Sequence, residues 1–172
     1  MNKNKLPILF YIVLCLTTQL SVAAKFQCPK SKNDKYSEDS RKVIKIIDGD
    51  TIVVEQHIRL IGVNTPETKH PKKPKEYFGK EATEFTKSTL IGKEVCLEYD
   101  NKRIDYYGRT LAYVHLLEDK LFNAELVKQG YSHAYTKYPF KYSEDFIKYE
   151  KEARQNKKGF WNKVKDLRNG TK

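Results

Sequence analysis

Short apolar runs separated by turn residues dominate the first two thirds of the chain. "KVIKII" and "TIVVE" are rich in β-branched residues and flank "DGD", a tight-turn signal, and "IRLIGV" follows almost at once. "KEVCLEYD" alternates Val95, Leu97 and Tyr99 with Cys96 and Glu98, as a half-buried strand does. Together with "TLAYVHLL", these runs predict five short strands.

Other segments have the spacing of helices. From Tyr77 to Leu90, apolar residues recur near helical spacing. A short helix is predicted from Asn123 to Gln129, closed by Gly130, because glycine often terminates helices. A longer helix is predicted from Ser143, as its N-cap, to Lys157, and Gly159 is expected to end it.

The order of these elements predicts the fold class. Three strands, a helix, two strands and two helices indicate an α+β protein, a β-barrel with helices. Short antiparallel strands with a helix inserted after the third predict a five-stranded Greek-key barrel, the OB-fold, with about three helices. This architecture often binds oligonucleotides, but a fold alone does not determine function.

The ends of the chain differ in composition from the middle. Residues 1–24 have lysines, an apolar run from Leu6 to Leu16 and small residues, the pattern of a secretory signal peptide. The alternative is a membrane anchor, but the run is well short of the roughly 20 residues that span a bilayer. We expect a flexible N-terminal arm at 25–40, the domain at 41–162 and a C-terminal tail at 163–172. The protein is therefore expected to be secreted or periplasmic.

The net charge favours an anionic partner. The chain carries +11, and +9 without the first 24 residues, which contain two lysines and no acid. Nucleic acid, anionic lipid and a cell-wall polymer all fit such a surplus, and solubility alone is a further explanation. Charge thus indicates a class of partner and no chemistry.

Two cysteines remain after the predicted signal peptide. Cys28 and Cys96 can form a disulfide in an oxidising compartment, or can stay unpaired. No histidine is near either one in the sequence, so there is no zinc signature.

Three short pieces place acids or arginines where strands end. "DGDT" contains Asp48 and Asp50, "IRLIGVNTPE" contains Arg59 and Glu67, and "DYYGRTLAY" contains Arg109. Each alone is explained by an ordinary turn or by an arginine that reaches solvent. Together they fit phosphodiester hydrolysis, which needs cations on the phosphoryl oxygens, a base for water and oxygen donors for a divalent metal.

Several separated motifs resemble one family. "IIDGDTI", "RLIGVNTPETKHPKK", "DYYGRTLAYV", "NAELVKQGYSHAY" and "KKGFW" are similar to the staphylococcal nuclease family, in order, from about Val43 to Trp161. The resemblance implies an OB-fold barrel and a secreted, calcium-dependent endonuclease. It implies cleavage of DNA and RNA at the bond to the 5′-oxygen, which leaves 3′-phosphate ends.

The resemblance also assigns catalytic roles. Arg59 matches a phosphate-binding arginine, Glu67 matches the general base that activates water, and Arg109 matches an arginine that stabilises the transition state. These roles agree with the chemistry argued from the residues themselves.

The same matching gives a set of calcium ligands. Asp50 and the backbone carbonyl of Thr65 match ligand positions, and Asp48 is expected in the outer shell. Asn64 stands where the well-studied branch of the family has an aspartate. An amide oxygen can still bind calcium, but one negative charge is lost, so we expect weaker affinity or a changed metal preference.

Nucleic-acid contacts are expected from aromatic and basic residues. Tyr107 and Tyr135 match positions that contact the nucleotide, consistent with base stacking on OB surfaces. Lys72 and Lys73, in "KHPKKPK", are expected to attract phosphate without regard to sequence.

Two other functions remain as alternatives. A non-catalytic OB-fold module could bind nucleic acid, but it would have no need for Glu67 beside two arginines. A basic exported protein could bind a cell-surface polymer, but this leaves the residues at the strand ends unexplained. No partner helix is evident, so a monomer is expected.

Overall fold

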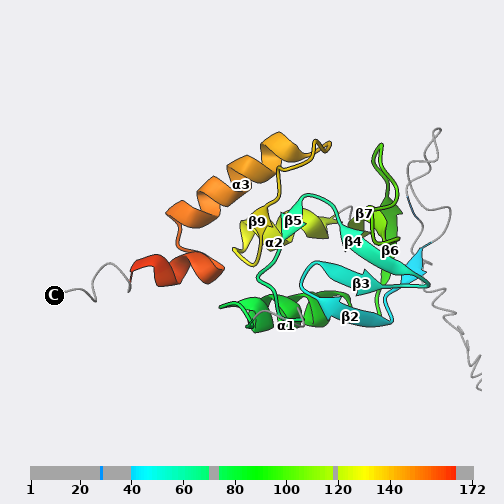
Figure 1. The fold of residues 1–172 in the computed structure, drawn as a ribbon, viewed down its shortest axis with the longest axis horizontal. Coiled ribbons are helices and arrows are strands. Elements are labelled where there is room, and N and C mark those ends of the chain that lie inside the picture. Colours follow the sequence, from blue (N-terminus) through cyan, green and yellow to red (C-terminus); the bar gives the residue numbers. More distant parts are fainter. Residues whose placement is uncertain (1–27, 29–39, 70–73, 118–119, 166–172) are drawn as a thin grey trace, which may run out of the picture.

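The computed structural model describes residues 28, 40–69, 74–117 and 120–165 (Figure 1). Within these residues the strands are β1 (Arg41–Lys42), β2 (Lys45–Asp48), β3 (Thr51–Val53), β4 (His57–Leu60), β5 (Val63–Asn64), β6 (Glu94–Glu98), β7 (Thr110–Leu116), β8 (Lys120–Leu121) and β9 (His133–Ala134). The helices are α1 (Gly79–Leu90), α2 (Phe122–Lys128), α3 (Ser143–Gln155) and the 3-10 helix η2 (Gly159–Lys165). The α+β class and the three α-helices are as predicted, while the predicted strands are divided into shorter segments.

Most strands belong to one mixed sheet of seven strands. Its order is β1-β6-β7-β4-β3-β2, with β8 paired to β7, and β5 and β9 form a separate pair. β4 and β7 are parallel, whereas the other pairs are antiparallel. Because β4 and β7 run in the same direction, Ile58, near the start of β4, lies beside Thr110, at the start of β7.

Residues 41–48 occupy both ends of the sheet order. Their first part, β1, pairs with β6, and their second part, β2, pairs with β3. The change of partner occurs at Val43, whose N–H donates to Lys93 O, and at Ile44, whose N–H donates to Val53 O. The sheet order therefore begins and ends on one continuous stretch of chain.

The core lies between the sheet and the helices. In β4, Ile58 and Leu60 are buried, whereas His57 is exposed and Arg59 is half-buried, so the strand alternation turns Arg59 away from the core. α1 packs against β2, α2 against β7, and α3 against α2, and Figure 1 shows α1 and α3 on opposite sides of α2. The largest fully buried apolar side chains are those of Tyr113, Phe122, Phe146, Ile52, Ile58, Leu60, Leu90, Leu97 and Leu126.

The predicted strand "IRLIGV" is interrupted at Gly62. This glycine has φ +76°, and a Cβ on it would lie 2.6 Å from the Phe140 ring. β4 therefore ends at Leu60, and a new strand begins at Val63. The alternation of apolar and polar residues could not predict this break, because the break depends on the Phe140 ring, 78 positions away in the sequence.

The predicted N-cap of the last helix is wrong by one residue. Ser143 is the first helical residue, Tyr142 is the N-cap, and no side chain caps this end. Because Ser143 has already entered the helix, its hydroxyl does not cap the following amides. The predicted end of α2 is confirmed, since Gly130 has φ +72° just after the helix.

Cys28 and Cys96 form a disulfide, with 5.4 Å between their Cα atoms. Of the two alternatives that the sequence left open, pairing is thus the one observed. The predicted signal peptide, nearly all of the predicted arm and the end of the predicted tail lie outside the described residues. In the described part of the chain, no helix combines the length and apolarity that crossing a membrane requires.

Candidate active site

The "DGD" turn connects β2 to β3 and brings two carboxylates together. Asp48 and Asp50 are each only 8% exposed. Between them, a Cβ on Gly49 would lie 2.8 Å from Thr65 Cγ2, so only glycine fits without a shift of its neighbour. Thr86 of α1 donates a hydrogen bond of 2.6 Å to Gly49 O. The turn is therefore fixed from two sides.

Asp50 links an arginine to the next turn. Its Oδ2 atom lies 3.2 Å from Arg59 Nη2 and accepts a hydrogen bond of 3.0 Å from Thr65 N. Its Oδ1 atom accepts from Thr51 Oγ1 at 3.1 Å. Arg59 Nη1 donates to Leu60 O, so the guanidinium is held in place by two acceptors. Two of the three pieces predicted from the sequence thus meet at one carboxylate.

Asp48 binds Thr68, in the same turn as Thr65. Its Oδ1 atom accepts hydrogen bonds from Thr68 Oγ1 at 2.9 Å, from Thr83 Oγ1 at 3.0 Å and from Gly49 N at 2.8 Å. Its Oδ2 atom accepts from Thr68 N at 3.3 Å. Since Thr83 belongs to α1, Asp48 connects the β2–β3 turn, the following turn and the helix.

Glu67 is bound through both its backbone and its side chain. Its N–H donates to Glu76 Oε2 at 3.1 Å, and its carbonyl accepts from Glu76 N at 2.8 Å. Its Oε1 atom accepts from Lys69 N at 2.7 Å. Lys69 N thus holds Oε1, and Oε2 accepts no hydrogen bond from the residues that the structure describes.

These contacts define the acid-bound turn, residues Thr65–Lys69. Pro66 has no N–H, and each of the other four backbone N–H groups donates to a carboxylate. In chain order, the acceptors are the side chains of Asp50, Glu76, Asp48 and Glu67. The conformation of the turn thus depends on four acids rather than on a regular ladder.

Arg109 is held by its own hairpin. Its Nε and Nη2 atoms each lie 2.7 Å from Asp105 Oδ2, and its guanidinium lies over the Tyr107 ring at 5.3 Å. It directly precedes Thr110, which pairs with Ile58 in the parallel register, so it lies beside the start of β4. Within the described residues, no direct contact joins Arg109 to Asp50, Arg59 or Glu67.

Asp105 is perturbed by its position beside Arg109. Burial alone would raise the pKa of its carboxyl group, but hydrogen bonds from the backbone and side chain of Arg109 and from Tyr107 N outweigh burial. The pKa of Asp105 is therefore lowered from its ordinary value. The Arg109 guanidinium thus stabilises the charged form of the Asp105 carboxylate.

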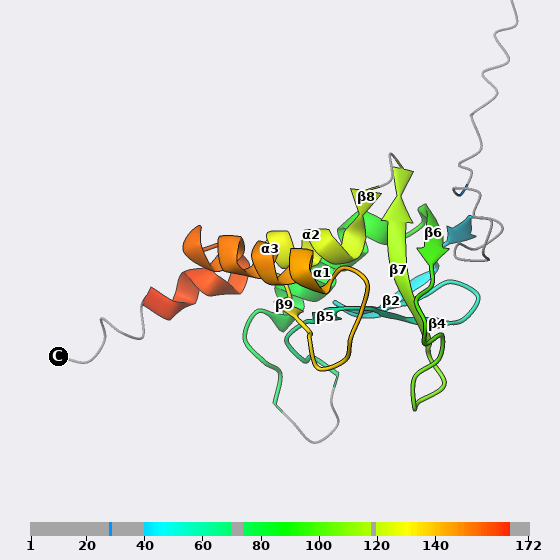
Figure 2. The ribbon, with the colours of Figure 1, turned by 90° about the horizontal axis from the view of Figure 1, so that it is seen from above.

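Exposed aromatic side chains stand on the loops around this region. Tyr107 is 79% exposed and Tyr106 is 93% exposed, whereas Tyr135 is half-buried. Figure 2 shows three segments extending on the same side of the molecule: the chain flanking 70–73, the hairpin 101–109, and the loop before α3. The last two are joined by a hydrogen bond of 3.0 Å from Lys141 N to Asp100 Oδ2.

The oxygen atoms at the site fit a hard cation in kind. Asp48 and Asp50 offer carboxylates, Thr65 a carbonyl, and Asn64, whose side chain is exposed, an amide oxygen. Calcium takes such oxygen ligands and completes its shell with water. In the described ranges, however, no three His, Cys, Asp or Glu side chains are grouped as a metal cluster. Lys72 and Lys73 lie outside the described residues.

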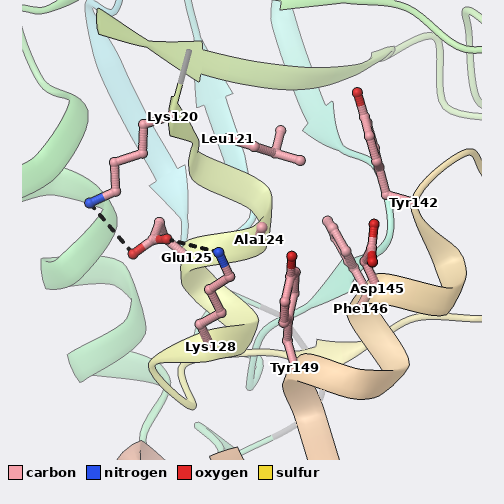
Figure 3. Close-up of a pocket in the computed structure, with 9 residues that line it drawn as sticks. All are labelled: Lys120, Leu121, Ala124, Glu125, Lys128, Tyr142, Asp145, Phe146 and Tyr149. Carbon is pink, nitrogen blue, oxygen red and sulfur yellow. Dashed lines mark ion pairs between the residues drawn. The ribbon is translucent and has the colours of Figure 1, made fainter. Parts of the chain in front are cut away.

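The hollow drawn in Figure 3 lies elsewhere. It is a cavity of about 280 Å³ between α2 and α3, and none of its lining residues was predicted for the site. Glu125 projects from α2 and forms ion pairs of 3.5 Å with both Lys120 and Lys128 (Figure 3). Three of the charged residues that line the hollow, Lys120, Glu125 and Lys128, are thus paired with one another.

Sequence reasoning did not identify four of the residues that hold the site. Thr68, Thr83, Glu76 and Asp105 bind the predicted residues or their backbone. For Asp105, the "DYYGR" spacing offered a signal, because an aspartate followed by a turn commonly accepts amide hydrogen bonds two residues later. Thr83 offered none, since it looks like any exposed helical residue.

The fold and site define an α+β protein in which Arg59 and Asp50, from two different strand ends, form an ion pair. Residues 57–163 match the family described as staphylococcal nuclease homologues. The chain is 46% identical to the thermonuclease of Staphylococcus hyicus over 131 residues, which are 73% of this chain and 77% of that protein. The chain belongs to the staphylococcal nuclease family.

Other relatives have related names. The thermonuclease of Staphylococcus intermedius is 47% identical over 110 residues, 61% of this chain and 64% of that protein. Endonuclease YncB of Bacillus subtilis (strain 168) is 33% identical over 150 residues, 80% of this chain and 71% of that protein. The likeness thus extends to relatives outside the staphylococci.

Proposed function

We propose that this protein is an exported endonuclease that hydrolyses phosphodiester bonds of DNA and RNA. Family membership and relatives named thermonuclease and endonuclease support a nuclease. The observation that carries the proposal is the position of Asp50 Oδ2, which binds both Arg59 Nη2 and Thr65 N. It fixes a guanidinium next to the turn that bears a glutamate.

The two arginines bind and stabilise the phosphate. Arg59 uses the N–H groups that remain beyond its bonds to Asp50 and Leu60 O to contact non-bridging oxygens. Arg109, held at Asp105, contacts the same group from the other strand end. Their interactions strengthen as negative charge builds on the phosphoryl oxygens, so they lower the barrier.

Glu67 is the general base. Lys69 N holds its Oε1 atom, which leaves Oε2 to accept a proton from water. The water oxygen then attacks phosphorus in line with the 5′-oxygen, and the bond between phosphorus and that oxygen breaks. The 5′-oxygen keeps the electron pair of that bond and takes up a proton from solvent to leave as a hydroxyl. The phosphate stays on the 3′-oxygen, so the products carry 3′-phosphate ends.

A single calcium ion would be held by Asp50, the Thr65 carbonyl and the Asn64 amide, with Asp48 outside its first shell. When bound, it would supply positive charge next to the phosphate. Asp48 meanwhile holds the acid-bound turn through Thr68. Because Asn64 carries no charge, we expect a higher calcium requirement than a carboxylate would give.

Substrate binding extends beyond the phosphate. The exposed Tyr107 ring and the Tyr135 ring offer faces for stacking on bases. Lys72 and Lys73 attract the backbone electrostatically, so binding weakens as salt rises. No base-specific contact is needed for such a surface.

The same reasoning extends to the architecture and to export. We propose that the sheet is a five-stranded OB-fold barrel, with residues 41–48 as the strand shared by both ends of the sheet order. We propose a signal peptide at 1–24, an arm at 25–40, the nuclease domain at 41–162, a tail at 163–172 and a monomer. The Cys28–Cys96 disulfide supports an oxidising, secreted or periplasmic location.

The test is digestion of plasmid DNA and of RNA with calcium, magnesium or a chelator, with Glu67→Gln compared with the unaltered protein. We expect the variant to lose about a hundredfold or more in kcat, because general-base catalysis contributes about that much. Glu84→Gln, an exposed glutamate in α1, is the matched control and should keep full activity.

Two results would overturn the proposal. Undiminished cleavage by Glu67→Gln would remove the general-base role. No cleavage by the unaltered protein in any metal would favour a non-catalytic OB-fold module that binds nucleic acid. Chemical analysis of the product ends tests the 3′-phosphate separately.

A further inference from the structure

Glu76 lies nine residues after Glu67 and meets it again through two hydrogen bonds. Glu67 N donates to Glu76 Oε2, and Glu76 N donates to Glu67 O. Both polar groups of the Glu67 backbone are therefore bound by a single residue. The chain between them returns to its starting point, so these two residues form the neck of a loop that contains "KHPKKPK".

Glu76 is also connected to α1. Its carbonyl accepts a hydrogen bond of 3.2 Å from Gly79 N, at the first residue of the helix. A Cβ on Gly79 would lie 2.8 Å from Pro66 O, so the start of the helix lies directly against the acid-bound turn. α1 packs in turn on β2, which leads into the "DGD" turn. Glu76 thus joins the Glu67 backbone to a fixed helix.

Among the described residues, the Glu76 carboxylate makes no hydrogen bond or ion pair other than the bond to Glu67 N. It is exposed, so it contributes nothing to the core, and surface side chains of this kind rarely affect stability by more than about 0.5 kcal/mol. Its Oε2 atom instead accepts a hydrogen bond from the backbone N–H of Glu67. That bond fixes the backbone from which the Glu67 side chain projects.

We propose that Glu76 is a positioning residue for Glu67. Resting on the proposed function, this inference adds that the base is aimed by a second acid across the neck of the basic loop. With the Glu67 backbone bound by Glu76 and its Oε1 atom by Lys69 N, the position of the other carboxylate oxygen, Oε2, is restricted. Such confinement aids catalysis, because small misplacements of a catalytic group are costly.

The test compares Glu76→Ala with Glu76→Gln in the full protein. Alanine removes the acceptor for Glu67 N, so kcat should fall about tenfold while KM changes less than about twofold. Glutamine keeps an oxygen at the same place and should restore kcat to within about threefold of the unaltered protein. Glu84→Ala, also at an exposed glutamate, should leave both parameters unchanged.

A second measurement needs no activity. Hydrogen exchange of the Glu67 amide, followed by NMR without substrate, should be about tenfold faster in Glu76→Ala than in the unaltered protein or Glu76→Gln. The midpoint of urea unfolding should be nearly the same in all three, which separates positioning from a general loss of folding.

The outcomes distinguish this inference from the function on which it rests. If the unaltered protein cleaves and Glu67→Gln does not, full kcat in Glu76→Ala overturns the positioning role alone. A Glu76→Gln variant as impaired as Glu76→Ala overturns it too, since the acceptor would not be what matters. Absence of cleavage by the unaltered protein removes the proposed function and, with it, this role.

Discussion

Asp105 illustrates how one carboxylate can organise both a backbone turn and a guanidinium. Its Oδ1 atom accepts from Tyr107 N at 2.8 Å and from Arg109 N at 2.9 Å, and its Oδ2 atom binds the Arg109 side chain. Because these bonds favour the charged form, the pKa of Asp105 lies below its ordinary value of 3.8. The direction in which Arg109 points therefore depends on this carboxylate.

Asp105→Asn should alter how stability depends on pH. A lowered pKa in the folded state stabilises the protein above the ordinary pKa, and this stabilisation is lost as pH falls through the lowered value. As the pH falls below the ordinary pKa of an aspartate, the unfolding free energy of the unaltered protein should thus decrease more steeply than that of the variant. Urea unfolding at several pH values measures both. Asp145→Asn, exposed on α3, should keep the original slope, and equal slopes for all three proteins would contradict the prediction.

For individual residues, the sequence indicated which groups carry chemistry but not what holds them. Asp50 and Arg59 were predicted to meet because their pieces end strands, and an ion pair does connect them. The hydrogen bond from Thr83 to Asp48 spans 35 residues and could not be predicted, since it depends on how α1 docks. The roles of Glu67 and Arg109 stay predictions.

Two glycines bring the end of α2 and the start of η2 into close backbone contact. Gly130, after α2, and Gly159, at the start of η2, approach each other so closely that a Cβ on Gly130 would lie 2.3 Å from Lys158 O. Phe160 N then donates to Gly130 O at 3.0 Å. The end of α2 and the C-terminal helix are thus joined backbone to backbone.

Gly130→Ala should destabilise the protein much more than Gly92→Ala. Both glycines have similar positive φ angles, +72° and +74°, but a Cβ on Gly92 would meet nothing within 4 Å. Gly92→Ala should cost about 1 to 2 kcal/mol from backbone strain alone. Gly130→Ala should cost at least about 2 kcal/mol more, because backbone must move apart. Chemical denaturation of the two variants gives the difference, and equal losses would show that the close contact is unimportant.

For the helices and strands, the spacing of apolar residues predicted their positions but not the breaks within the strands. The break at Gly62 depends on the Phe140 ring, and the split between β1 and β2 depends on two different partners. Ser143 was predicted as a cap from its residue type, but the helix begins at it rather than after it. The boundaries at Gly62 and between β1 and β2 are thus determined by contacts distant in sequence.

The disulfide connects the N-terminal region to β6, a strand of the seven-stranded sheet. Cys96 is fully buried in β6, and Cys28 is 9% exposed. The bridge closes a segment of 68 residues, and long closed segments restrict the unfolded chain strongly. The domain as a whole, rather than a local turn, is therefore stabilised.

Removing the bridge should lower the unfolding free energy substantially. For a closed segment of this length, chain entropy predicts a loss of about 4 kcal/mol in a Cys28→Ala, Cys96→Ala double variant. Urea unfolding with and without a reducing agent measures this. Reductant should destabilise the unaltered protein and leave the double variant unchanged. A reduced protein as stable as the oxidised one would refute the prediction.

For the protein in its entirety, the α+β class, three helices and the family followed from the sequence. The parallel pairing of β4 with β7 did not, because neither strand shows which neighbour it will have. The sequence also left open whether Cys28 pairs with Cys96, because it does not show that the two residues lie close together in the fold.

The position of Cys96 links oxidation of the two cysteines to contact between distant parts of the chain. β6 receives β1 at Val95, next to Cys96, so the strand that pairs with the start of residues 41–48 also carries the sulfur that meets Cys28. The bond between the two sulfurs therefore requires the N-terminal region and β6, 68 residues apart in the sequence, to come together.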